Sequence, residues 1–210
     1  MQVELPMKCG PCGTEGKQSI RVDASSFEWK CPGCGATAYV VLDLDLTIGF
    51  LLVERSRYEL QEKRDYALSI TMAAFALDCE LSRLFIKWTR IADLVAGRQF
   101  DAAKCERELK RLKFIPKFKA VAEMLYPGGI EAYVQQTPAL AATIQQKFPS
   151  LHIGSLAEDF HKAVMKPRNA IAHEGDLHFD KKDAERCLSI ASFGLNIFRD
   201  MDLERRKLLI

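Results

Sequence analysis

Cys9-Gly-Pro-Cys12-Gly13 and Cys31-Pro-Gly-Cys34-Gly35 are two copies of one short motif near the start of this 210-residue chain. A Cys-x-x-Cys turn presents two thiolates from one tight loop, and two such turns supply the four ligands of a closed tetrahedral zinc site. A glycine follows each second cysteine, where a positive φ turns backbone amides towards the sulfurs. The pattern therefore predicts one structural Zn²⁺ ion bound by Cys9, Cys12, Cys31 and Cys34.

Two other chemistries use paired cysteines, namely a redox-active dithiol and an iron–sulfur cluster. A catalytic zinc would keep one coordination position open, and no histidine or carboxylate replaces a cysteine here. Stretches with strand character lie at 18–22, 27–30 and 37–46. These features favour a zinc ribbon, a small sheet that does not fold without its metal. We assign it to residues 1–47.

Composition excludes several classes of protein. The chain is 48% hydrophobic and 28% charged, a composition typical of globular proteins. Its net charge of +2 makes it only mildly basic. No uncharged apolar run approaches the roughly 20 residues of a membrane helix, and no basic segment followed by an apolar one marks a secretory signal. We therefore expect a cytoplasmic protein with no membrane partner.

Beyond residue 47 the apolar residues recur at helical spacing, as at Leu68, Met72, Phe75 and Cys79. This pattern predicts a long helix over 57–90. Capping residues and breakers predict the others, with Asp101, Asp180 and a Ser155–Glu158 capping box at three starts and Pro127-Gly128-Gly129 as a break. The predicted helices cover 102–112, a stretch ending at 126, 130–146, 156–173 and 181–205. The expected fold class is mainly α: a small β zinc ribbon followed by an all-α bundle of five or six helices at 48–210.

One segment carries the functional hypothesis: Lys166-Pro167-Arg168-Asn169-Ala170-Ile171-Ala172-His173-Glu174-Gly175. It resembles the Arg-x4-His motif of the HEPN superfamily, in the form where a polar residue follows the arginine. In that family the motif ends the penultimate main helix, before a loop and a long final helix, and the same order is predicted here. The resemblance covers about eight residues as a motif and residues 50–206 as topology, and it implies a HEPN-like helical domain.

The resemblance implies a metal-independent endoribonuclease with Arg168, Asn169 and His173 as catalytic residues. A histidine has a pKa suited to taking the proton of a 2′-hydroxyl, and a guanidinium offsets charge on the phosphorane. On an ideal α-helix, Arg168 lies about 140° from His173. By likeness the protein acts on RNA as a homodimer, leaves a 2′,3′-cyclic phosphate and a 5′-hydroxyl, and serves in a toxin or antiviral-defence role.

Substrate-binding residues are expected at Lys166 and, in the basic run at 104–119, at Lys110 and Arg111. The run is alternatively a solvated helix face. His173 is alternatively a cation at a helix C-terminus, and Arg168 a partner of Glu158, Glu174 or Glu80.

The alternative function is a non-catalytic HEPN-like module that binds RNA, a nucleotide or a protein. A transcription-associated ribbon with a helical dimerisation domain is a third hypothesis. A regulatory protein partner is compatible with each of these readings.

Overall fold

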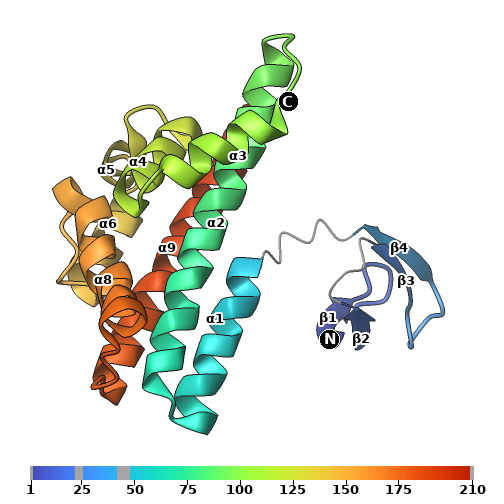
Figure 1. Ribbon diagram of the computed structural model, residues 1–210. Helices are drawn as coiled ribbons and strands as arrows, with labels where there is room; N and C mark the ends of the chain where they lie inside the picture. The colour runs from blue at the N-terminus through green and yellow to red at the C-terminus, as the bar shows by residue number, and fades with distance from the viewer. Residues whose placement is uncertain (1, 22–25, 42–47, 209–210) are drawn as a thin grey trace. The chain divides into compact units, whose positions relative to one another are not determined.

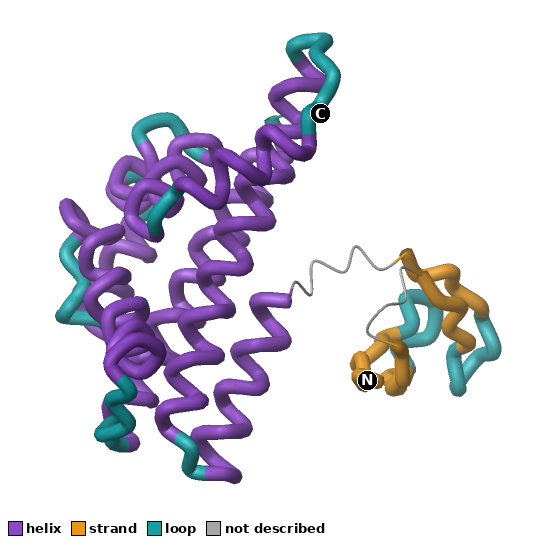
Figure 2. The backbone as a smooth tube through the Cα atoms, in the orientation of Figure 1, coloured by secondary structure: helices purple, strands orange, loops and turns teal. Residues whose placement is uncertain are grey.

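A computed structural model describes residues 2–21, 26–41 and 48–208. The chain divides into two compact units, Met1–Asp45 and Leu46–Ile210. This division falls close to residue 47, where the spacing of apolar residues changes from that of strands to that of helices. The first unit carries strands and the second carries helices, as Figure 2 shows by colour.

The N-terminal unit consists of two antiparallel hairpins. Strand β1 (Gln2–Lys8) pairs with β2 (Glu15–Arg21), and β3 (Ser26–Lys30) pairs with β4 (Thr37–Val41). Each Cys-x-x-Cys motif forms the turn of one hairpin, so the described strands make two two-stranded sheets rather than the single small sheet predicted. Strand β1 was not predicted, because Pro6 lowers its strand character; a two-stranded ribbon tolerates proline on its free edges. Residues 42–46 of the predicted last strand lie outside the described residues.

The C-terminal unit confirms the mainly helical fold class. Its described part holds more helices than the five or six predicted, and three π-helical turns extend or link them. The α-helices are α1 (Ile48–Tyr58), α2 (Tyr66–Val95), α3 (Ala102–Arg111), α4 (Phe114–Leu125), α5 (Gly129–Gln135), α6 (Pro138–Lys147), α7 (Leu156–Phe160), α8 (Lys166–Asn169) and α9 (Lys181–Lys207). The π turns are η1 (Glu59–Lys63), η3 (His161–Met165) and η4 (Ala170–Glu174), and η2 (Ile153–Ser155) is a 3₁₀ turn.

Helices α2 and α9 form the centre of this unit and run parallel, since Cys187 contacts Ile70 near their starts and Asp202 binds Trp88 near their ends. Figure 1 shows α1 beside α2, with α4 to α8 on the opposite side of the α2–α9 pair. The Ser56 hydroxyl on α1 donates to the Ser69 carbonyl on α2 at 2.8 Å. This bond satisfies polar groups where the two helices are buried against each other.

A cluster of aromatic rings fills the core between the layers. The fully buried Phe118 ring on α4 lies 5.3 Å from the Phe160 ring and 4.8 Å, edge-on, from the Phe198 ring on α9. Gly194 on α9 admits the Phe160 ring, because a Cβ at this position would lie 2.6 Å from its Cε1 atom. The close approach explains the glycine in mid-helix, where it otherwise lowers stability.

Two predicted helices are interrupted, and one predicted capping box does not form although its helix begins at Leu156 as predicted. The helix expected over 57–90 is interrupted, because Arg64 adopts a left-handed conformation with φ 56° and Asp65 caps a new helix through the Leu68 amide. The helix expected over 130–146 divides into α5 and α6, with Pro138 at the start of α6. Ser155 donates to Asp159 instead of forming a capping box with Glu158.

Two predicted caps are confirmed. Asp101 accepts from the Lys104 amide at 2.9 Å and begins α3. Asp180 forms a capping box with Asp183 and begins the final helix α9. The helix before it ends at Gly175, which has a positive φ of 67°.

Candidate functional sites

The four paired cysteines meet at one point. Their sulfur atoms all lie within 4.8 Å of one another. Cys9 Sγ lies 3.6 Å from Cys34 Sγ, and Cys12 Sγ lies 3.5 Å from Cys31 Sγ, so the closest contacts join the two motifs. All four are free thiols. The sulfurs are too far apart for a disulfide, whose bond length is about 2 Å.

The two motifs have the same backbone geometry. In the first, the Gly13 amide donates to the Cys9 carbonyl and the Cys9 amide donates to the Thr14 carbonyl, at 2.7 and 2.9 Å. The second repeats both bonds between Cys31 and Gly35 and between Cys31 and Ala36, at 3.0 and 2.8 Å. Gly13 and Gly35 both have φ 71°, as the sequence predicted. The repeated turn places each thiol pair on the same side of its hairpin.

This arrangement can hold a metal ion. A tetrahedron of sulfurs at about 2.3 Å from its centre has edges of about 3.8 Å, close to the observed separations. The Thr14 hydroxyl and backbone lower the pKa of the Cys12 thiol to about 6, which favours the thiolate that metals require. A backbone hydrogen bond from Cys12 lowers the pKa of Cys9, but burial and the neighbouring thiols outweigh it and raise that pKa to about 12. Cys9 and Cys31 are buried together with Trp29, whereas Cys12 and Cys34 are exposed. Trp29 is thus a core residue of this unit.

The segment with the Arg-x4-His pattern is the last part of one continuous helical stretch. From α7 to η4 the chain stays helical over 156–174, with π turns at η3 and η4. The Gly175 amide donates to the Ala170 carbonyl, five residues back. A residue in such a π turn rotates by about 80° instead of about 100°, so the offset between Arg168 and His173 falls from about 140° to about 90°.

Arg168 has a defined environment. Its guanidinium donates to Asn169 Oδ1 at 3.0 Å, and its Cζ lies 5.0 Å from the centroid of the Phe75 ring on α2. Its Nε atom is buried and has no hydrogen-bond partner within the described residues. A buried unpaired donor costs free energy, so this atom is an exception to the usual pairing of buried polar groups.

His173 and Lys166 lie on the same stretch as Arg168, and both are exposed. Within the described residues, neither side chain has a hydrogen bond or an ion pair. The structure therefore joins Arg168 to Asn169 but leaves the His173 imidazole facing solvent. None of the three predicted acidic partners binds Arg168: Glu80 accepts from Arg83 at 2.7 Å, Glu158 accepts from Lys119 at 2.7 Å, and Glu174 is exposed.

The basic run at 104–119 does not act as one surface. Lys117 is buried and binds Asp78 on α2 at 2.8 Å, and Lys119 binds Glu158. Lys110 and Arg111, at the end of α3, are exposed and without an ion-pair partner in the described part of the chain. Lys117 thus serves packing and Lys119 is paired at the surface, whereas the two predicted substrate-binding residues are exposed and unpaired in the described part of the chain.

A histidine–aspartate pair in the loop before α7 was not predicted from the sequence. His152 Nδ1 lies 2.9 Å from Oδ2 of the buried Asp159, which also accepts from the His152 amide and from Ser155. Burial raises the pKa of Asp159, but these hydrogen bonds outweigh it and hold the pKa below its ordinary value. The pair ties the loop before α7 to the helix. A separation of seven residues did not predict this contact, because His152 reaches Asp159 only after the loop has turned back towards α7.

No helix among the described residues is long and apolar enough to cross a lipid bilayer. Comparison of the whole chain with protein-family models, curated proteins and solved structures gives no match.

Proposed function

We propose that the helical unit is a metal-independent endoribonuclease of the HEPN type, in which Arg168, Asn169 and His173 act on RNA. The observation that carries the proposal is the pairing of Arg168 with Asn169 one turn before an exposed histidine, at the end of a helix that precedes the long final helix α9. This is the position of the motif in the family that the segment resembles.

The local geometry supports the proposed roles. The Arg168 side chain keeps an unpaired buried Nε–H, and Asn169 orients its guanidinium. The guanidinium of the partly buried Arg168 has the planar, forked donors that suit phosphate oxygens. The η4 turn brings His173 round towards Arg168, and π turns are frequent at functional sites.

In the proposed reaction, the unprotonated imidazole of His173 takes the proton of a ribose 2′-hydroxyl. The 2′-oxygen attacks the adjacent phosphorus, the bond from phosphorus to the 5′-oxygen breaks, and that oxygen leaves after gaining a proton. The products are a 2′,3′-cyclic phosphate and a 5′-hydroxyl. Arg168 stabilises the negative charge that develops on the phosphorus oxygens.

Cleavage of total RNA in a magnesium-free buffer with EDTA tests this proposal. His173→Ala should lower the rate by about 100-fold or more, the usual contribution of a general base, and leave RNA affinity nearly unchanged. His178→Ala is the matched control, since it removes an exposed histidine five residues further along. If the wild type and His173→Ala are equally inactive on diverse RNAs, the alternative of a non-catalytic binding module replaces the nuclease.

We also propose that two copies act together, with both motifs lining one cleft. Two large apolar side chains near the motif support a contact of this kind: Phe75, which the Arg168 guanidinium covers, and Leu177, which is 67% exposed in the following loop. Sedimentation of the wild type and Leu177→Asp over a range of concentrations tests it. A wild type that stays monomeric at all concentrations would contradict the dimer.

For the N-terminal unit we propose a structural zinc ribbon. Four thiolates at tetrahedral separations, with no open position, are the usual donor set of structural zinc. Metal analysis should find one zinc per chain, and Co²⁺ substitution should give the visible bands of a tetrahedral thiolate site. Purified protein that contains iron and sulfide would instead establish an iron–sulfur cluster.

A further inference from the structure

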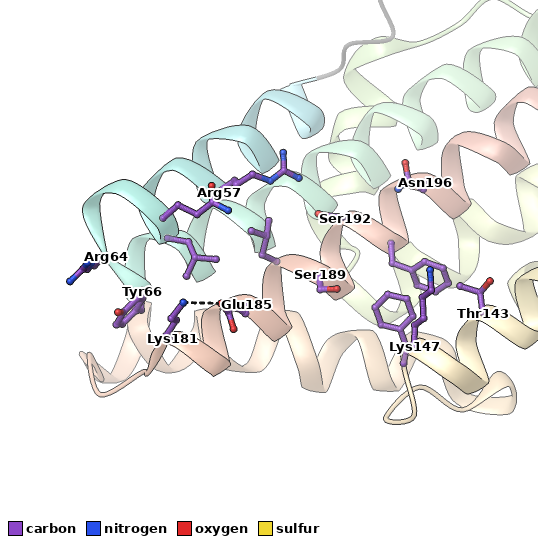
Figure 3. A pocket seen from close by; sticks show the side chains of 15 residues that line it. Arg57, Arg64, Tyr66, Thr143, Lys147, Lys181, Glu185, Ser189, Ser192 and Asn196 are labelled. Atoms are coloured by element: carbon purple, nitrogen blue, oxygen red, sulfur yellow. Dashed lines mark ion pairs between the residues drawn. The ribbon is translucent and has the colours of Figure 1, made fainter.

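The largest hollow described in the helical unit is a groove between the α1–η1 segment, α6 and α9. Its volume is about 850 Å³. Figure 3 shows α9 along its floor, with Arg64 and Tyr66 at one end and Lys147 and Thr143 at the other. From Lys181 to Asn196, α9 extends for about 22 Å, which is long enough for several nucleotides.

The groove is basic. Four cationic side chains line it, namely Arg57, Arg64, Lys147 and Lys181, against one carboxylate, Glu185. Glu185 lies 3.4 Å from Lys181, and Arg57 pairs with Glu54 outside the groove. Within the described residues, Arg64 and Lys147 have no acidic partner, so these two cations are available to phosphates.

The floor of the groove offers two further kinds of contact. The half-buried rings of Phe148 and Phe193 are stacked, with centroids 4.3 Å apart and an interplanar angle of 20°. Unpaired bases stack on such rings, whereas bases within a duplex cannot. Ser189, Ser192 and Asn196 follow one face of α9 into the groove (Figure 3), and their polar groups suit ribose hydroxyls and base edges.

The groove adjoins the proposed catalytic segment. A second hollow of about 630 Å³ shares Arg64 and Tyr66 with the groove and is also lined by Ile171 of η4. Ile171 lies between Asn169 and His173 in the sequence. Arg168, Asn169 and His173 line neither hollow, so Ile171 is the residue that connects the η4 segment with the hollow beside the groove.

We propose that this groove binds single-stranded RNA and is the main substrate-binding surface, in place of Lys110 and Arg111. The inference rests on the proposed function because it takes RNA as the ligand, and it deepens that function by locating where the strand is held. Phosphates bind Arg64 and Lys147, and bases stack against the Phe148–Phe193 pair. These residues come from helices far apart in the sequence.

Arg64 gives this proposal an unusual test. It is the one non-glycine residue with a positive φ in the described part of the chain, and glycine is the residue that suits this conformation. Arg64→Gly should therefore leave the unfolding temperature at or above that of the wild type while weakening RNA binding. A purely structural arginine would not show these opposite effects.

The experiment measures fluorescence anisotropy of a short labelled oligouridine, with every protein in the His173→Ala background so that no cleavage occurs. Arg64→Gly with Lys147→Ala should weaken binding roughly tenfold and reduce the slope of log affinity against log salt by about 1.4. Arg90→Ala with Lys182→Ala is the matched control, since it removes two exposed cations outside the groove. This control should stay within about twofold of the parent. Phe148→Leu should weaken oligouridine binding and leave any duplex RNA binding unchanged.

Equal losses of oligouridine affinity in the groove and control variants would show general attraction of phosphates and overturn the proposal. An affinity that is the same in all the variants and the parent would also overturn it. The outcome is distinguishable from that of the nuclease test. Wild-type cleavage with no effect of the groove variants would reject the groove alone. Groove-dependent binding without any cleavage would reject the nuclease alone.

Discussion

The two units of this chain are held together in different ways. In the N-terminal unit the described buried core consists of Cys9, Trp29 and Cys31, and two of these are members of the thiol cluster. The helical unit buries a continuous set of apolar side chains along α2, α4 and α9. Burial of apolar surface supplies most of the stability of a domain, and in the described part of the N-terminal unit this burial centres on the thiol cluster. The difference fits the proposal that a metal ion stabilises the N-terminal unit, whereas packing stabilises the helical unit.

Removal of the metal should have the largest effect and tests the comparison directly. Binding of structural zinc contributes about 10–16 kcal/mol in small zinc modules. A strong chelator, or Cys31→Ser, should therefore unfold the N-terminal hairpins completely and leave the helical circular dichroism nearly unchanged. Amide NMR spectra distinguish the two units. A loss of most helical signal after metal removal would show that the units are not independent.

The reverse experiment removes packing from the helical unit. Phe118 is fully buried against Phe114, Phe160 and Phe198, and Phe118→Ala should cost about 3–5 kcal/mol. The helical unfolding temperature should fall by about 10 °C. Trp29→Ala is the counterpart in the other unit and should weaken metal retention without moving that temperature. Equal effects of both variants on the helical transition would contradict separate cores.

A smaller effect is expected from the buried ion network at the far ends of α2 and α9. Asp202 is 3% exposed and accepts from Lys87 and Trp88, at 2.7 Å each, and from Arg206. Burial raises the pKa of Asp202, but the hydrogen bonds from Lys87 and Trp88 and the nearby charges outweigh it and hold the pKa below its ordinary value. Asp202→Asn should destabilise the helical unit by about 2 kcal/mol.

The pH dependence has a definite sign. A carboxylate whose folded pKa is lowered stabilises the fold at pH values above its unfolded pKa, near 4, and loses that contribution as the pH falls through the folded pKa. The difference between wild type and Asp202→Asn should therefore be constant at neutral pH and shrink below about pH 4. Asp93→Asn breaks the surface pair with Arg98 and should cost less than about 1 kcal/mol. A difference that grows on acidification would contradict the network.

The meeting of the four cysteines was predictable because they lie in two local turns whose glycines fix the geometry, whereas the bound metal stays a prediction. The caps at Asp101 and Asp180 were predictable for the same reason. The break at Arg64 was not, because a positive φ has no sequence signal when the residue is not glycine. The groove was missed because its residues lie between Arg57 and Asn196 and are brought together only by the packing of α1, α6 and α9. Local turns and caps were therefore predictable where the contact spans three or four residues, whereas the His152–Asp159 pair and the groove depend on how the chain turns back.

The smallest expected effect concerns the backbone at the junction of η1 and α2. A left-handed residue other than glycine costs about 1–2 kcal/mol, and glycine loses about 0.5–1 kcal/mol through the entropy of the unfolded chain. Arg64→Gly should therefore raise the stability of the helical unit by about 0.5–1 kcal/mol in denaturant unfolding. Lys63→Gly is the matched control, because Lys63 ends the right-handed π turn and should lose about 1 kcal/mol. If Arg64→Gly and Lys63→Gly destabilise the unit equally, the backbone at Arg64 is unstrained. The presence of arginine at this position then needs no ligand to explain it. If only Arg64→Gly stabilises, the arginine is retained against the preference of the backbone, as expected for a side chain that binds phosphate.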